Sequence, residues 1–148
     1  MDLFEHPNKE LWLKREEWLD KLIEESEVGS YLVSDQSTAL FMDMRIAYCA
    51  GAWLSVVVMS VSILDAHLRE TEAMDNRIGT AKLFNEYYSG ENEDVNWLRL
   101  LRNKYVHLDI DQPALTIDKW FDNQKELEQN AIRAIEICVK AFFQSPGT

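Results

Sequence analysis

Hydrophobic residues recur every three or four positions along most of the 148-residue chain. This spacing places apolar side chains on one face of an α-helix. It predicts helices over residues 8–26, 37–70, 75–88, 95–108 and 118–144. The chain has only five glycines and three prolines, which favours helices over a β fold with many turns. We therefore predict an all-α protein, an up-and-down bundle of four to five helices.

Polar and turn-forming residues mark the ends of these helices. Asn8 precedes the first helix and is a favourable N-cap residue. Gly90 is a favourable residue to end the third helix, and Pro113 follows the fourth. Residues 27–38 are expected to connect the first helix to the second.

The second predicted helix contains a long apolar stretch, residues 46–64, with no charged side chain. A membrane-spanning helix needs about 20 apolar residues, so one alternative is a helical protein of the membrane. A helix that is apolar on all sides is also typical of the centre of a soluble bundle. The stretch includes Ser55, Ser60 and Ser62, and no second span or basic flank accompanies it. We therefore expect a long central helix in a soluble bundle and no membrane contact.

The composition indicates a single domain, residues 1–148, with a hydrophobic core. Hydrophobic residues make up 47% and aromatic residues 11% of the chain, which excludes disorder for most of it. The five tryptophans fall mainly on apolar stripes, so we expect them in the core. His6 and His67 are expected at the surface.

The two cysteines, Cys49 and Cys138, lie far apart within apolar helical patterns. Neither belongs to a Cys-x-x-Cys motif or a Cys/His cluster, so we expect no metal, no cofactor and no redox site. Buried free thiols are typical of proteins in a reducing compartment. The N-terminal stretch MDLFEHPNKE lacks the basic and apolar regions of a signal peptide, so we expect a cytoplasmic location.

The chain is acidic, with 26 acidic and 15 basic residues and a net charge of −11. Such a charge repels a phosphate backbone at long range and argues against generic nucleic-acid binding. A local basic cleft remains compatible with it, because the field at a site depends most on the nearest charges.

The stretch LRNKYVHLD, residues 101–109, combines a cation, an amide and one of the three histidines. On a helix, Asn103 and His107 lie one turn apart with Arg102 beside them, and Val95 falls among these residues. The opposite, apolar side holds Trp97, Leu98, Leu101, Tyr105 and Leu108. An ordinary solvated helix face is the alternative, because basic residues near a helix C-terminus also suit the helix dipole.

The same stretch resembles the signature of the HEPN superfamily. That signature is an arginine, a polar residue that is often asparagine, three further residues and a histidine near the end of a late helix. Arg102, Asn103 and His107 match this pattern. The predicted bundle, with a long apolar helix before the motif and an amphipathic helix after it, is similar to the family's architecture.

The resemblance implies a homodimer in which two such motifs face each other across a cleft. Active family members are metal-independent ribonucleases, many of them toxins or phage-defence effectors, and other members are noncatalytic binding modules. His107 would then act as general base or acid, and Arg102 would stabilise charge on the pentacoordinate phosphate. Asn103 would orient His107 or a phosphate oxygen. Attack by a ribose 2′-OH predicts cyclic-phosphate ends and no cleavage of DNA.

Residues around the motif are candidates for supporting roles. Asp109 occupies the position at which some HEPN toxins carry a tyrosine that a partner antitoxin nucleotidylates, so this control is not expected here. Arg99 and Lys104, doubled in a dimer together with Arg102, would make the cleft locally basic. Asp65, at the end of the apolar stretch, either pairs with Arg102 or is an ordinary acid where the helix leaves the core.

Two functions of different classes follow from the resemblance. The first is a homodimeric, metal-independent endoribonuclease, with RNA as candidate substrate and an antitoxin or regulatory protein as candidate partner. The second is a noncatalytic module that binds a nucleotide, an RNA end or a partner protein in the same groove. The acidic charge favours the second, and the complete set of Arg102, Asn103 and His107 favours the first.

Overall fold

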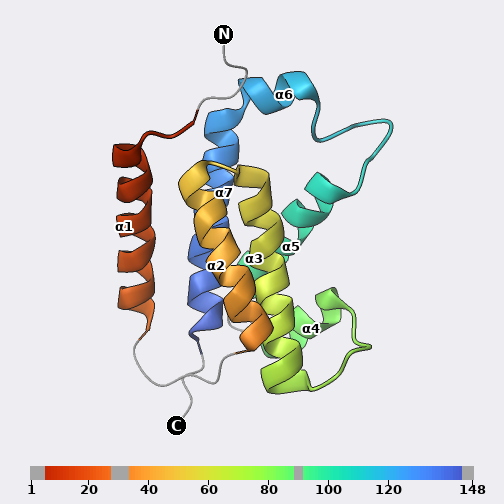
Figure 1. Ribbon diagram of the computed structural model, residues 1–148. Helices are drawn as coiled ribbons and strands as arrows, with labels where there is room; N and C mark the ends of the chain where they lie inside the picture. The colour runs from red at the N-terminus through yellow and green to blue at the C-terminus, as the bar shows by residue number, and fades with distance from the viewer. Residues whose placement is uncertain (1–5, 28–33, 89–91, 145–148) are drawn as a thin grey trace.

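The computed structural model describes residues 6–27, 34–88 and 92–144, and these residues form helices without any strand (Figure 1). The elements are α1 (Lys9–Ser26), α2 (Asp35–Ala50), α3 (Trp53–Leu68), the π-helical turn η1 (Arg69–Ala73), α4 (Thr80–Tyr87), α5 (Asn92–Val106), α6 (Ile117–Asp122) and α7 (Gln124–Phe142). The predicted all-α class is confirmed.

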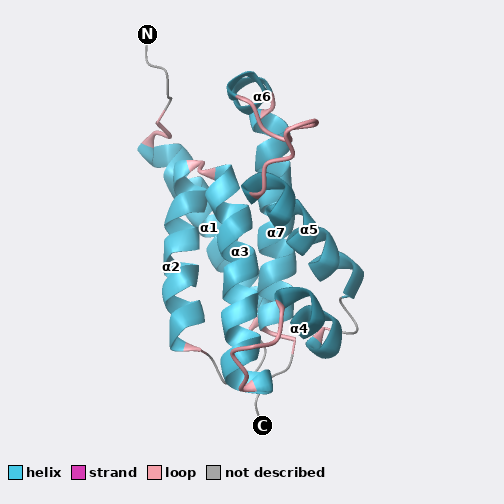
Figure 2. Cartoon of the chain, turned by 90° about the vertical axis from the view of Figure 1, so that its right-hand side faces the viewer, coloured by secondary structure: helices cyan, strands magenta, loops and turns pink. Residues whose placement is uncertain are grey.

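Helix α3 is the centre of the fold and packs against α2, α4, α5 and α7 (Figures 1 and 2). Val56, Val57, Val61 and Leu64 on this helix are completely buried. Burial of each such side chain stabilises the fold by roughly 1.5–3 kcal/mol. The second half of the apolar stretch is therefore core. Among the described helices, none is both long enough and apolar enough to cross a membrane.

The single long helix predicted over residues 37–70 is wrong, because the chain reverses at Gly51. Gly51 ends α2 in the left-handed conformation, with φ of 82°. The N–H of Ala52 donates to the carbonyl of Ala47 at 2.8 Å, and the N–H of Gly51 donates to that of Tyr48 at 3.1 Å. These two bonds form a Schellman motif, which closes a helix on a left-handed glycine. Helices α2 and α3 consequently pack side by side (Figure 2).

The other helix ends agree with the sequence pattern only in part. The predicted cap is confirmed, since Asn8 Oδ1 accepts a hydrogen bond from Leu11 N at 2.8 Å. The third helix begins at Thr80 instead of residue 75, because Asp75 Oδ1 accepts from Arg77 N at 2.7 Å and holds a turn. The last predicted helix is divided at Asn123 into α6 and α7. The expected end at Gly90 lies outside the described residues.

Polar contacts attach α1 to the rest of the fold. The guanidinium of Arg45 on α2 pairs with Glu16 and Asp20 on α1. Arg15 donates from its guanidinium to the carbonyl of Cys49 at 3.1 Å and lies 4.9 Å from the centre of the Trp53 ring. These contacts connect α1 to α2 and to the turn between α2 and α3.

Candidate functional site

Helix α5, which carries the motif, is fixed to the hydrophobic core by its apolar side. Val95 and Leu98 are completely buried, and Leu101 and Tyr105 are half-buried against the core. Tyr105 Oη accepts a hydrogen bond from Asn130 Nδ2 of α7 at 3.0 Å. Burial raises the pKa of Tyr105, so its hydroxyl stays protonated at neutral pH. The predicted anchoring by Leu98, Leu101 and Tyr105 is confirmed.

Two residues of the predicted helix wheel are placed differently. Val95, predicted among the polar residues, is buried, because this end of α5 packs against α3 and α4. Leu108, predicted to anchor the helix, is 75% exposed. Helix α5 ends at Val106, so the residues that follow leave the helical path that would have carried Leu108 to the core.

Arg102 and Asn103 are hydrogen-bonded to each other, whereas the His107 side chain forms no hydrogen bond or ion pair with another described residue. Arg102 Nε donates to Asn103 Oδ1 at 2.9 Å, and both side chains are half-buried. His107 lies immediately after the last residue of α5 and is exposed. Its backbone N–H still donates to the carbonyl of Asn103 at 2.9 Å, which continues the helical hydrogen-bonding pattern for one more residue. Within one chain, therefore, Arg102 is hydrogen-bonded to Asn103, and neither side chain is hydrogen-bonded to the side chain of His107.

The supporting residues around the motif have local contacts. Arg99 donates to Asn96 Oδ1 at 2.8 Å, and Lys104 is exposed. Asp109 Oδ1 accepts from the backbone N–H of Asp111 at 3.0 Å and of Gln112 at 3.3 Å. The carboxylate of Asp109 thus organises the loop that follows α5.

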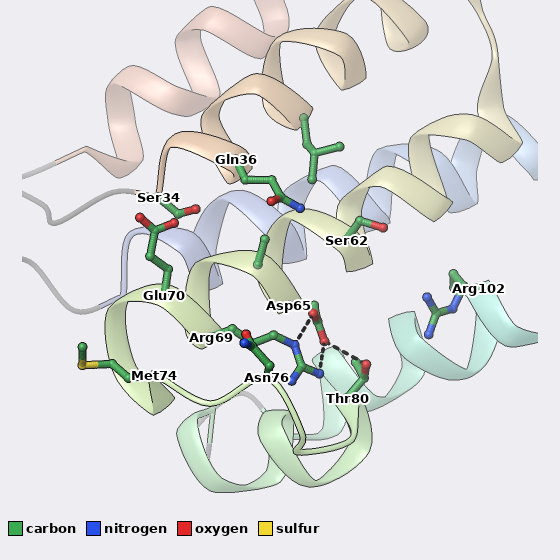
Figure 3. Close-up of a pocket in the computed structure, with 12 residues that line it drawn as sticks. Ser34, Gln36, Ser62, Asp65, Arg69, Glu70, Met74, Asn76, Thr80 and Arg102 are labelled. Carbon is green, nitrogen blue, oxygen red and sulfur yellow. Dashed lines mark hydrogen bonds and ion pairs between the residues drawn. The ribbon is translucent and has the colours of Figure 1, made fainter.

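Arg102 lines a pocket of about 760 Å³ between the N-terminus of α2, helix α3, η1 and α5 (Figure 3). Its other lining residues come from separate segments of the chain: Ser34, Gln36, Leu40, Ser62, Asp65, Ala66, Arg69, Glu70, Met74, Asn76 and Thr80. The sequence did not indicate this pocket, because its walls come from segments up to 68 positions apart, from residue 34 to residue 102.

Asp65 pairs with Arg69 and not with Arg102. Its two carboxylate oxygens accept from Arg69 Nε at 2.7 Å and from a terminal guanidinium nitrogen of Arg69 at 3.0 Å. Thr80 Oγ1 also donates to Asp65, at 2.8 Å (Figure 3). Arg69 lies one helical turn beyond Asp65 and reaches it without any tertiary rearrangement. Within the described ranges, no carboxylate lies at ion-pair distance from Arg102.

His67, expected at the surface, is buried, while His6 is exposed as expected. The imidazole of His67 packs against Phe142 of α7, with 4.5 Å between ring centres. Its Nδ1 has no hydrogen-bond partner among the described residues. Burial lowers the pKa of His67, and the nearby Glu70 opposes this effect. The surface position predicted for His67 is wrong because α7 covers this side of α3, which the sequence does not show.

Both cysteines are free and buried, as predicted. The Sγ of Cys138 lies 3.7 Å from the carbonyl oxygen of Ser60, and burial raises the pKa of this thiol to about 12. Burial also raises the pKa of Cys49. Across residues 6–27, 34–88 and 92–144, no cluster of three or more His, Cys, Asp or Glu side chains could hold a metal ion.

Exposed apolar residues lie next to the exposed end of the motif in the sequence. Leu100 is 51% exposed and precedes Asn103 by three positions and His107 by seven, so it shares their face of the helix. Val106, Leu108 and Ile110 follow and are also exposed. The outward loop that contains Leu108 and Ile110 is visible in Figure 1, between α5 and α6. The sequence does contain one indication of this surface, because Leu100 is an apolar residue on the polar face of the helix.

No family model, curated protein or solved structure matches this chain. The resemblance to the HEPN superfamily consequently rests on the residues of the motif and on the all-α fold. The chemistry open to the site follows from its own geometry.

Proposed function

We propose that the chain forms a HEPN-type homodimer that cleaves RNA without a metal ion. The observation that carries this proposal is the guanidinium of Arg102. It is half-buried at a pocket, it bonds the amide of Asn103, and the described residues offer it no carboxylate partner. An arginine without a carboxylate partner among the described residues, five positions before an exposed histidine, is suited to bind a phosphate group.

The proposed reaction is an intramolecular transesterification of the RNA strand, in which the phosphorus is transferred from the 5′-oxygen to the 2′-oxygen. The 2′-oxygen of a ribose attacks the adjacent phosphorus while its proton passes to one His107 imidazole. The bond from phosphorus to the 5′-oxygen breaks, and the partner's His107 supplies a proton to that oxygen. Imidazoles suit both steps because they exchange protons near neutral pH. The products are a 2′,3′-cyclic phosphate and a 5′-hydroxyl end.

Arg102 and Asn103 support the charge changes of this reaction. Arg102 stabilises the extra negative charge on the pentacoordinate phosphate. Asn103 already accepts a hydrogen bond from Arg102 through Oδ1, so its NH₂ group is left to donate to a phosphate oxygen or to the imidazole. Arg99 and Lys104, present twice in a dimer, add positive charge beside the site and counteract the net charge of −11.

The exposed apolar side chains around the motif support the dimer. Leu100, Val106, Leu108 and Ile110 are each 47–84% exposed and lie within seven positions of His107 in the sequence. Apolar groups gathered on one surface favour burial against another protein. Association of two copies through this surface brings the two motifs together and removes water from them. A toxin or phage-defence role, with an antitoxin or regulatory protein as partner, belongs to the same proposal.

A noncatalytic binding module is the second candidate function. It is favoured by the net charge of −11, and by Arg102 hydrogen-bonding to Asn103 while no described contact joins Arg102 to His107 within one chain. In this case the same surface holds a nucleotide, an RNA end or a partner protein, and Arg102 provides the anchoring charge.

An RNA cleavage assay in EDTA separates the two functions. Wild-type protein should cut single-stranded RNA, and His107→Ala or Arg102→Ala should lower the rate by about 10²–10⁴. His6→Ala and Arg77→Ala are matched controls, because both side chains are exposed and outside the site. The ends should carry cyclic phosphate, and a substrate with 2′-deoxyribose should resist cleavage. Equal activity of wild type and the two site variants would identify a contaminating nuclease and refute the ribonuclease.

A further inference from the structure

The pocket beside Arg102 has features that the motif itself does not explain. At about 760 Å³ it falls within the range of about 300–1,000 Å³ that is typical of small-ligand sites. Only Arg102 comes from the motif, and the remaining walls come from the N-terminal end of α2 with its cap Ser34, from α3, η1 and the segment after it, and from Thr80 at the start of α4. The chain thus has room for a ligand group next to its proposed phosphate-binding arginine.

One wall of the pocket is held together by hydrogen bonds, and its two charges cancel. Asp65 and Arg69 neutralise each other through two hydrogen bonds, and Thr80 holds the carboxylate from the other side. Arg69 also donates to the backbone carbonyl of Asp75 at 3.3 Å, which ties the segment before α4 to α3. This cluster shapes the pocket and leaves Arg102 as the cation that is open to an anionic ligand.

The charges that remain favour a ligand with a single phosphate. Figure 3 places Arg102 and Glu70 at opposite ends of the pocket. Glu70 forms no ion pair within the part of the chain that the structure describes. A phosphate is attracted at the Arg102 end, whereas a second phosphate near Glu70 is repelled. A carboxylate at that end can instead accept from the amino or imino hydrogens of a base.

Two side-chain amides, Gln36 and Asn76, line the pocket from different segments (Figure 3). Both are exposed, and neither side chain hydrogen-bonds to another described residue. An amide carries a donor and an acceptor together, which is the combination that pairs with the edge of a nucleobase. None of the pocket-lining residues is aromatic, so a base here is recognised by its edge more than by stacking.

We propose that this pocket receives the base of the nucleotide whose 3′-phosphate is cleaved. The phosphate lies on Arg102, and the base edge faces Gln36, Asn76 and Glu70. This inference rests on the proposed function, because Arg102 belongs to both the reaction centre and the pocket. It adds that the enzyme selects the base on the 5′ side of the cut, and that Gln36 and Asn76 determine this selection.

Direct binding tests the pocket without any need for cleavage. The His107→Ala protein, whose pocket is intact, is titrated calorimetrically with each of the four ribonucleoside 3′-monophosphates and with inorganic phosphate. One nucleotide should bind at least tenfold more tightly than the others and than phosphate. Adding Gln36→Ala or Asn76→Ala should weaken the binding of that nucleotide about tenfold. Gln129→Ala should leave the binding unchanged, because Gln129 is an exposed residue of α7. Equal binding of all five probes, or insensitivity to both amide variants, would overturn the proposal.

Sequencing of cleaved RNA ends keeps this inference separate from the ribonuclease proposal. Wild type should prefer one base on the 5′ side of the cut, and Gln36→Ala should lose the preference while cleavage continues. Cleavage that depends on His107 but ignores base identity would refute the pocket's role and leave the ribonuclease standing. Selective nucleotide binding without any cleavage would refute the ribonuclease and restrict the pocket to nucleotide binding.

Discussion

The three histidines of the chain lie in different surroundings, and this decides what each can do. His6 and His107 are exposed, whereas His67 is 9% exposed and packs on Phe142. An exposed imidazole exchanges protons with a substrate or with water. A buried imidazole without a partner for Nδ1 is held in the neutral form, because protonation would place a charge in the core. His107 is thus accessible to a substrate, and the burial of His67 predicts that folding depends on pH.

Protonation of His67 should destabilise the protein in mild acid. Burial lowers the folded-state pKa of His67 below 6.5, so the unfolded chain binds this proton more readily. The resulting contribution to the free energy of unfolding is fully present above pH 6.5 and is lost as the pH falls through the lower folded-state pKa. Urea unfolding at pH 7.5, 6.5 and 5.5 measures it.

The variant that isolates this effect is His67→Leu. Its free energy of unfolding should fall less between pH 6.5 and pH 5.5 than that of wild type, because leucine binds no proton. His6→Leu should keep the wild-type pH dependence, since His6 is exposed. The same loss in wild type and His67→Leu would assign the pH dependence to the carboxylates instead.

At the scale of helices and turns, Gly51 determines the topology. The left-handed turn at Gly51 divides the apolar stretch between α2 and α3, so that α3 lies at the centre and α2 covers it. The carboxylate of Asp65 and the N-terminus of α2 are thereby brought to the same pocket. Without the reversal, the N-terminal end of α2 and the C-terminal end of α3 would lie at opposite ends of one long helix.

Gly51→Ala should therefore destabilise the fold by more than Gly79→Ala does. A Cβ at residue 51 has space, with its nearest neighbours at 3.5 Å, but a φ of 82° costs an alanine about 1 kcal/mol. Gly79 has φ of −70°, and a methyl group there would meet no atom within 4 Å, so alanine should lose only the preference for glycine at the N-cap of α4. Thermal and urea unfolding of both variants compare them. Equal destabilisation would contradict the importance of the left-handed turn.

At the scale of the whole molecule, the proposed function depends on a second copy. Arg102 and Asn103 are in contact, but His107 extends beyond the helix among exposed apolar side chains. The motif of one chain is therefore open on the side at which a second motif is proposed to complete it. Assembly and activity should be lost together when that surface is made charged.

Leu108→Asp and Ile110→Asp should convert the proposed dimer into a monomer, because each would bury a charge in the proposed interface. Sedimentation velocity at micromolar concentration measures the mass, and RNA cleavage is followed in the same samples. Leu13→Asp is the control, since Leu13 is exposed on α1, away from the motif. A wild-type monomer, or a variant monomer with full activity, would contradict the composite site.

The sequence by itself determined the helical class, the core stripes and the local content of the motif. These features depend on residue spacing along one helix, and such spacing is readable from the chain alone. The buried positions of Leu98, Cys49 and Cys138 and the N-cap at Asn8 follow from it. The adjacency of Arg102 and Asn103 is likewise a property of neighbouring positions.

Only the tertiary structure decided which helices meet and which side chains each helix covers. It buried His67 under α7, turned the chain at Gly51, and paired Asp65 with Arg69 instead of Arg102. It also gathered Gln36, Asn76 and Arg102 around one pocket. Contacts of this kind join positions far apart in the chain, and their energies depend on packing that no local pattern encodes. The motif was therefore visible in the sequence, and the pocket beside it was not.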